Sequence, residues 1–164
     1  MSHSLPMLGL LAFTGTASLC EVFRHEIPNR LIGGGLVAGL VLNTLSSSQP
    51  LPALVLGLLA VALGAAVAVP LWRLGMLGGG DVKLVAACGA FVTPLLMLGL
   101  LGHALLLLGL YAMLLFAVEQ RLGEALVAST RFILGYPQEA APGAGSVLSF
   151  APSLLIGAMV TWLD

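Results

Sequence analysis

Charged side chains are scarce in this sequence: only 8% of its 164 residues are Asp, Glu, Lys or Arg, against about 25% in soluble domains. With 59% hydrophobic residues, this scarcity excludes an ordinary soluble domain and indicates a membrane protein. The net charge of −1 excludes nucleic-acid binding driven by phosphate neutralisation. Cys20 and Cys88 lie in apolar segments and form no CxxC pair. Neither a metal site, a cofactor nor a disulfide framework is therefore indicated.

Long apolar runs make up most of the sequence. At about 20 residues per spanning helix, the length allows six spans, and we expect an all-α, polytopic membrane protein with a single domain over residues 1–164. The predicted spans are 5–22, 31–46, 51–72, 82–93, 95–118 and 146–163. A single helix over 82–118 would be about 55 Å long, which is too long for one crossing. We therefore expect a break near Pro94 and a short fourth span.

Basic residues occur in only three of the connections between these spans. If successive spans alternate in direction, the connections 22–30, 71–83 and 119–145 lie on one side of the membrane. They contain every Lys and Arg of the chain: Arg24, Arg30, Arg73, Lys83, Arg121 and Arg131. Because cytoplasmic loops are enriched in Lys and Arg, we expect these connections to be cytoplasmic and both termini to lie outside.

The segment Gly78-Gly79-Gly80-Asp81 interrupts the apolar pattern with an acid directly after three glycines. Glycine has no side chain, so a substrate backbone can approach it closely. Ionisable groups beside membrane-length apolar runs are costly and by default indicate a function. This segment is therefore the first candidate for a functional site.

A second acid, Glu21, ends the predicted first span, and Asp81 opens the fourth, so the topology places both at the cytoplasmic boundary. Two carboxyls brought together in a poorly solvated site share a proton. Such a pair can activate water as a base while protonating the developing oxygen or the leaving amine, which is the chemistry of aspartic proteases. On charge position alone, the simpler interpretation is favoured: both acids pair with Arg24 and Lys83 at the membrane interface.

Local motifs favour the catalytic interpretation over simple ion pairs. The segment 78–84 reads Gly-Gly-Gly-Asp-Val-Lys-Leu and matches the pattern GxGDxKL, while residues 24–31 contain R-x-x-I-P-N. Near the end, residues 150–153 read Phe-Ala-Pro-Ser and are followed by Gly157. In these segments the chain resembles the type IV prepilin peptidases, the GxGD class of intramembrane aspartyl proteases. The likeness is strongest to the small members that serve Flp (tight-adherence) pili.

The resemblance implies that Asp81 is one catalytic acid. Six residues before Ile27, where the family has its other aspartate, this chain has Glu21. Glutamate keeps the acid but moves the carboxyl by about 1 Å, a displacement that can cost roughly 100-fold in rate. Three explanations stay open: a working Glu–Asp dyad, a natural inactive homologue that binds or escorts pilins, or a substitution that silences the enzyme.

By resemblance, the expected function is cleavage of the basic leader from Flp-like type IV prepilins at the cytoplasmic face of the bacterial inner membrane. The expected partners are the prepilin substrate and the lipid bilayer. Residues Gly78–Gly80 would let the scissile segment approach in extended form. Lys83 and Arg24 are expected to balance charge, and Pro28 and Asn29 to shape the turn into the second span. The exact prepilin, any methylation of the pilin and the oligomeric state stay open.

A small transporter that uses the same carboxyls is the remaining alternative. It would place acids near mid-membrane and show an inverted repeat, and the sequence has neither. His103, inside the predicted fifth span, is better explained as a core histidine bonded to a neighbouring helix than as a proton relay. The transporter is therefore the weaker alternative.

Overall fold

The structure, a computed structural model, describes residues 4–24, 26–73, 77–118 and 151–163. These residues form helices and no β-strand, which confirms the expected all-α class for the described part of the chain. The predicted connection 119–145, with Arg121 and Arg131, lies outside the described residues.

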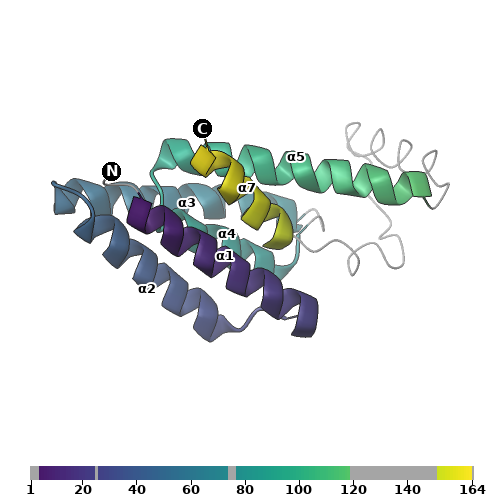
Figure 1. Cartoon of the computed structure of the whole chain (residues 1–164), viewed down its shortest axis with the longest axis horizontal. Helices are drawn as coiled ribbons and strands as arrows, with labels where there is room; N and C mark the ends of the chain where they lie inside the picture. Colours follow the sequence, from purple (N-terminus) through teal and green to yellow (C-terminus); the bar gives the residue numbers. More distant parts are fainter. Residues whose placement is uncertain (1–3, 25, 74–76, 119–150, 164) are drawn as a thin grey trace.

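The described residues form six helices (Figure 1). They are α1 (Ser4–Arg24), α2 (Asn29–Leu45), α3 (Pro50–Arg73), α4 (Gly79–Gly89), α5 (Pro94–Val118) and α7 (Ala151–Leu163). Each overlaps one of the six apolar segments predicted from the sequence. Three of them contain stretches that are long and apolar enough to cross a membrane: Leu5–Phe23, Pro50–Arg73 and Pro94–Tyr111. The helices α2, α4 and α7 have 17, 11 and 13 residues.

The expected break near Pro94 is confirmed. Helix α4 ends at Gly89, and the N–H groups of Ala90 and Phe91 then bond to Ala87 O and Cys88 O at 3.1 and 3.2 Å, which are turn hydrogen bonds. Pro94 begins α5, where its missing N–H costs nothing because the first N–H groups of a helix have no partner within it. The chain therefore reverses between two helices instead of continuing as one.

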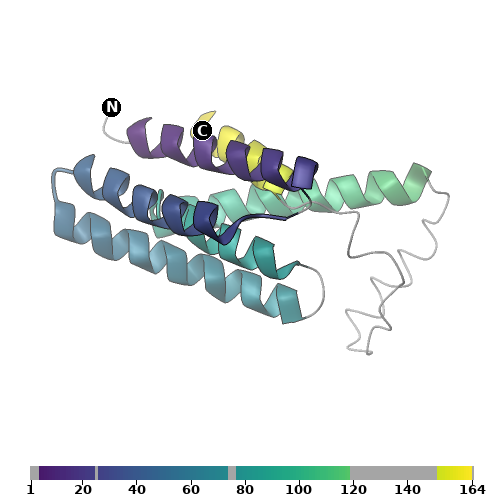
Figure 2. The same ribbon diagram turned by 90° about the horizontal axis from the view of Figure 1, so that it is seen from below.

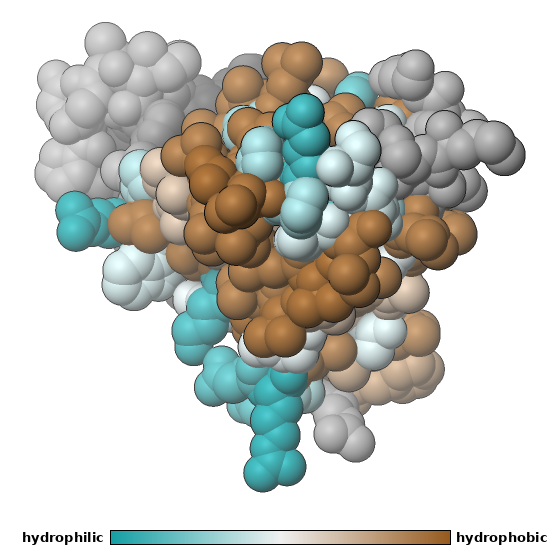
Figure 3. All heavy atoms as spheres, turned by 90° about the vertical axis from the view of Figure 1, so that its left-hand side faces the viewer, coloured by the Kyte–Doolittle hydropathy of each residue, from teal (hydrophilic) through white to brown (hydrophobic). Residues whose placement is uncertain are grey.

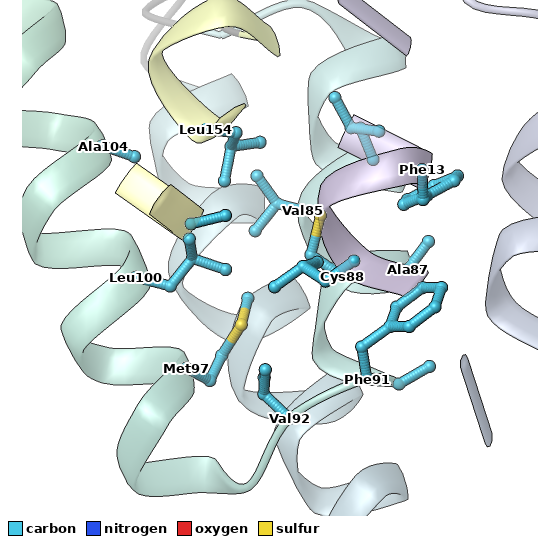
Figure 4. Close-up of a cluster of buried hydrophobic side chains, with 14 of the residues drawn as sticks. Phe13, Val85, Ala87, Cys88, Phe91, Val92, Met97, Leu100, Ala104 and Leu154 are labelled. Carbon is cyan, nitrogen blue, oxygen red and sulfur yellow. The ribbon is translucent and has the colours of Figure 1, made fainter. Parts of the chain in front are cut away.

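The short helix α4 lies at the centre of the bundle, because it contacts each of the other five described helices. Figure 2 shows α1 and α7 on one side and α3 on the other, with α4 between them. Four α4 side chains are completely buried: Leu84, Val85, Ala87 and Cys88. Figure 4 shows α4 side chains packed among residues of α1, α5 and α7.

Close contact with α3 fixes the position of α4. A Cβ added to Gly89 would lie 2.5 Å from the backbone of Ala60 and Val61, so the two helices approach closely where neither carries a large side chain. Gly64 on α3 is similarly close to α4, with Val85 O 3.1 Å from its added Cβ. This packing fixes the middle and the end of α4, the helix whose first turn carries Asp81, against α3.

Large apolar side chains cover much of the outer surface. Leu45, Leu51 and Leu95 are each more than 70% exposed. Figure 3 shows brown apolar side chains over much of the end that carries the α2–α3 connection, with polar ones gathered among them. An apolar exterior of this extent is what a lipid environment requires, and together with the three long apolar helices it indicates a membrane protein.

Candidate active site

Asp81 occupies the first turn of α4. Gly78 precedes the helix in an extended conformation and caps it, since its carbonyl accepts the N–H groups of Asp81 and Val82 at 3.1 and 3.3 Å. In return, the Gly78 N–H donates to Asp81 Oδ2 at 3.0 Å. The side chain is only 9% exposed. The glycine cap therefore fixes a buried carboxyl at the start of the central helix, where the helix dipole favours an acid.

Glu21 lies in the last turn of α1 and is half-buried. Its Oε2 accepts a hydrogen bond of 3.1 Å from the N–H of Ala151, the first residue of α7. Both candidate acids thus accept a backbone N–H at the beginning of a helix, Asp81 at α4 and Glu21 at α7. These two helix N-termini lie at the same end of the bundle as the end of α1 (Figure 1).

The two acids also interact electrostatically. Asp81 is not part of the three helices that are long enough to cross a membrane. It directly precedes the apolar segment 82–93. The pKa of Asp81 is raised from 3.8 to about 6, mainly because the carboxyl is buried. The hydrogen bond from the Gly78 N–H acts to lower this pKa, and the Glu21 carboxylate acts to raise it. Since α1 and α4 are in contact, the pair is best treated as coupled. The structure therefore brings the two predicted acids together, while their catalytic roles stay predictions.

The three glycines before Asp81 have different surroundings. A Cβ on Gly78 would lie 3.0 Å from Asp81 Oδ2, so a side chain there would crowd the carboxyl. A Cβ on Gly79 would meet only Trp72 Nε1, at 3.9 Å, and one on Gly80 would meet nothing within 4 Å. A side chain at position 78 would therefore press on the Asp81 carboxyl, whereas Gly79 and Gly80 leave exposed backbone beside the acid.

The other motif residues surround the start of α2. Pro28 is the N-cap of α2, and its carbonyl accepts the N–H of Leu31 at 2.9 Å. Lys83 Nζ donates to Asn29 Oδ1 at 3.1 Å, which links the two sequence motifs. Arg24 ends α1, but its side chain lies outside the described residues. The expected charge-balancing roles of Lys83 and Arg24 stay predictions.

Sequence reasoning missed two features close to Glu21. It singled out the Phe-Ala-Pro-Ser pattern as a motif without indicating that the Ala151 amide would bind Glu21; Phe150 itself lies outside the described residues. It also gave no signal for Ser18, which is 7% exposed and one turn before Glu21 on α1. The buried Ser18 Oγ has no hydrogen-bond partner in the described part of the chain. Because Glu21 and Ala151 are 130 positions apart, no local sequence pattern indicates their contact.

A separate pocket of about 550 Å³ lies near the other end of α1, with Pro6 in its lining. It is about 22 Å along the helix from Glu21. Uncharged residues line it, among them Asn43, the serines of the α2–α3 connection and Thr93. Because the pocket contains neither carboxyl, we place the candidate active site at the acids. Among the described residues, no three His, Cys, Asp or Glu side chains form a group that could hold a metal ion.

The family model of the type IV leader peptidase family matches residues 8–160. The chain belongs to this family. The match spans nearly the whole sequence and contains Glu21, Asp81 and the C-terminal motif. Neither the comparison with curated proteins nor the comparison with solved structures gave a match. Family membership therefore carries the identification, and it supports a leader-peptidase-like function.

Proposed function

We propose that this protein is an intramembrane aspartyl endopeptidase that cleaves the basic leader from Flp-like type IV prepilins at the cytoplasmic face of the inner membrane. The observation that carries the proposal is the pair of carboxyls, Glu21 and Asp81, which interact at one end of the bundle inside the family match. Six membrane spans with both termini outside are part of the same proposal.

The pair supplies both proton transfers that peptide hydrolysis needs. The ionised carboxyl takes a proton from water, and the oxygen of that water attacks the scissile carbonyl carbon. The protonated carboxyl donates its proton to the carbonyl oxygen. When the C–N bond breaks, the amine leaves with a proton from the dyad, and the water has added across the bond. Because burial raises the pKa of Asp81 to about 6, this acid carries a proton in most molecules below pH 6 and in a minority of them at pH 7.

The surroundings of the acids suit a substrate with a basic leader and an apolar helix. The bare backbone at Gly79 and Gly80 lets an extended segment lie beside Asp81. The apolar exterior of the bundle allows the substrate helix to remain in lipid next to the enzyme. All Lys and Arg residues fall in the sequence ranges 22–30, 71–83 and 119–145, which are predicted to be cytoplasmic. The positive-inside rule therefore favours a site that faces the cytoplasm.

A cleavage assay with purified protein in detergent tests the function. The substrate is a Flp-type prepilin, and the parent chain is compared with Glu21→Gln, Asp81→Asn and Glu21→Asp. We expect the parent to cleave and both amide variants to fail, because each removes one proton-transfer group. Glu26→Gln is the matched control, since Glu26 is an exposed acid close in sequence to Glu21.

The same assay separates the proposal from its alternative. If the parent is silent and only Glu21→Asp cleaves, the fold is competent and the glutamate makes this chain an inactive homologue. If the parent and all variants are silent although the prepilin binds, the peptidase proposal is wrong for this chain. Cleavage that survives Asp81→Asn would exclude the dyad.

A further inference from the structure

We propose that α7 is a positioning element for Glu21, in which the Ala151 amide holds the carboxyl and the close contact of Gly157 with α5 fixes where α7 lies beside α1. The inference rests on the proposed function and gives a role to the C-terminal motif. Glu21 Oε2 and Ala151 N are 3.1 Å apart, although their residues are separated by 130 positions. The contact is therefore set by how α7 packs, and not by local sequence.

Helix α7 is firmly packed, as a positioning element must be. It contacts α1, α4 and α5, and Ala151, Leu154 and Ala158 are completely buried along it. At its far end, Thr161 Oγ1 lies 3.4 Å from His103 Nδ1 on α5, the neighbouring-helix bond expected of this histidine. The start of α7 is therefore held in place by contacts that do not involve the acid.

Gly157 sets the distance between α7 and α5. A Cβ at this position would lie 3.2 Å from both Ala104 N and Leu100 O, which are backbone atoms of α5. Backbone atoms cannot rotate away as a side chain can, so a methyl group there must displace α7 by a few tenths of an ångström. Gly157 is six residues from Ala151, about 9 Å along the helix, so the displacement reaches the amide that binds Glu21.

The position of Glu21 matters because this acid has one more methylene than the family's aspartate. A longer side chain has more rotamers, and proton transfer needs the carboxyl within hydrogen-bond reach of the water. The Ala151 N–H fixes one of its two oxygens and leaves the other for the reaction. In this chain, α7 thus restricts a side chain that would otherwise be less ordered than an aspartate.

Hydrogen exchange at the start of α7 tests the contact without any need for cleavage. Pro152 has no N–H, so exchange in the first three residues of α7 reports only the amides of Ala151 and Ser153. We expect Glu21→Leu, which removes the acceptor, to speed exchange of Ala151 about tenfold, while Glu21→Gln, which keeps an acceptor oxygen, leaves it near the parent value. Equal exchange in all three proteins would overturn the proposal.

Kinetics with the prepilin substrate test the positioning role. We expect Gly157→Ala to lower kcat several-fold with KM unchanged, since a small displacement of a catalytic group reduces turnover. The matched control is Gly99→Ala at the same α5–α7 interface, where an added Cβ meets only Thr161 Cγ2 at 3.9 Å. Alanine favours helices more than glycine does, so unfolding of α7 would not explain a loss.

Equal kcat values for Gly157→Ala and Gly99→Ala would contradict the positioning role. A fall in kcat for Gly157→Ala alone, together with faster Ala151 exchange in that variant, supports it. If the parent does not cleave at all, the proposed function has failed. The exchange comparison then still decides whether the α7 amide holds Glu21.

Discussion

Lys83 Nζ lies 3.1 Å from Asn29 Oδ1, and this hydrogen bond joins two sequence motifs that are 54 residues apart. Lys83 lies two residues after Asp81 on α4, and Asn29 is the first residue of α2. Both side chains are exposed. The lysine expected to balance the charge of the acids thus bonds to an amide at the edge of the site.

We expect this exposed contact to contribute little to stability. Exposed polar pairs are worth roughly 0.2–1 kcal/mol, so Asn29→Ala and Lys83→Met should each lower the free energy of unfolding by less than about 1 kcal/mol. A double-mutant cycle by thermal unfolding in detergent measures the coupling. A coupling energy above about 2 kcal/mol would mean that the pair is shielded from solvent.

Asp81→Asn should change the pH dependence of stability. Because the pKa of Asp81 is raised to about 6 in the folded protein, the folded state holds this proton more tightly than the unfolded state between about pH 4 and pH 6. The contribution of protonated Asp81 to the free energy of unfolding is therefore complete below about pH 4, and it is lost as the pH rises through 6.

Asparagine does not titrate, so the stability of Asp81→Asn relative to the parent should increase from pH 4 to pH 7.5. The gain is at most about 3 kcal/mol, since each unit of pKa shift corresponds to about 1.4 kcal/mol. Unfolding temperatures of both proteins across this range provide the measurement. A difference that does not vary with pH would contradict the raised pKa.

Gly78→Ala should destabilise the start of α4. Its Cβ would lie 3.0 Å from Asp81 Oδ2, and alanine is a poorer N-cap than glycine, so we expect a loss of about 1 kcal/mol. Gly80→Ala is the matched variant, because its Cβ meets nothing within 4 Å. Its unfolding temperature should equal or exceed that of the parent. Equal losses in the two variants would show that a side chain at position 78 does not disturb the Asp81 carboxyl.

Gly89→Ala should be among the most damaging single-methyl substitutions in the bundle. The added Cβ would be 2.5 Å from the α3 backbone at Ala60 and Val61, and overpacking typically costs about 1–3 kcal/mol. Gly102→Ala on α5 adds the same methyl group where nothing lies within 4 Å. The test is the difference in unfolding temperature, and a smaller loss for Gly89→Ala than for Gly102→Ala would refute the close α3–α4 contact.

Ser18→Ala should leave stability unchanged or raise it by up to about 1 kcal/mol, because it removes a buried hydroxyl without a protein partner in the described residues. Thr14→Ala is the comparison one turn earlier. The Thr14 hydroxyl donates to Leu10 O at 2.8 Å, so that variant should lose stability. Thermal unfolding ranks the two variants. A larger loss for Ser18→Ala would show that its hydroxyl has a partner after all.

Much of the fold could be predicted because hydrophobicity and proline are local signals. The apolar runs located the six helices of the described residues, and Pro94 located the reversal between α4 and α5. Packing depends on contacts between distant residues, so the central position of α4 and the close approach at Gly89 could not be predicted. The sequence indicated two acids at one end of the bundle. The partner of Glu21 could not be predicted, since it is a backbone N–H, and every residue except proline has one.

The contact between Glu21 and Ala151 also sets an order of events during synthesis. The two residues are 130 positions apart, so the glutamate cannot meet its amide until residue 151 has left the ribosome and α7 has reached its place beside α1. A nascent chain that already contains both acids therefore still lacks the arrangement seen here. On the proposed function, the arrangement of the dyad is therefore complete only after α7 has packed beside α1.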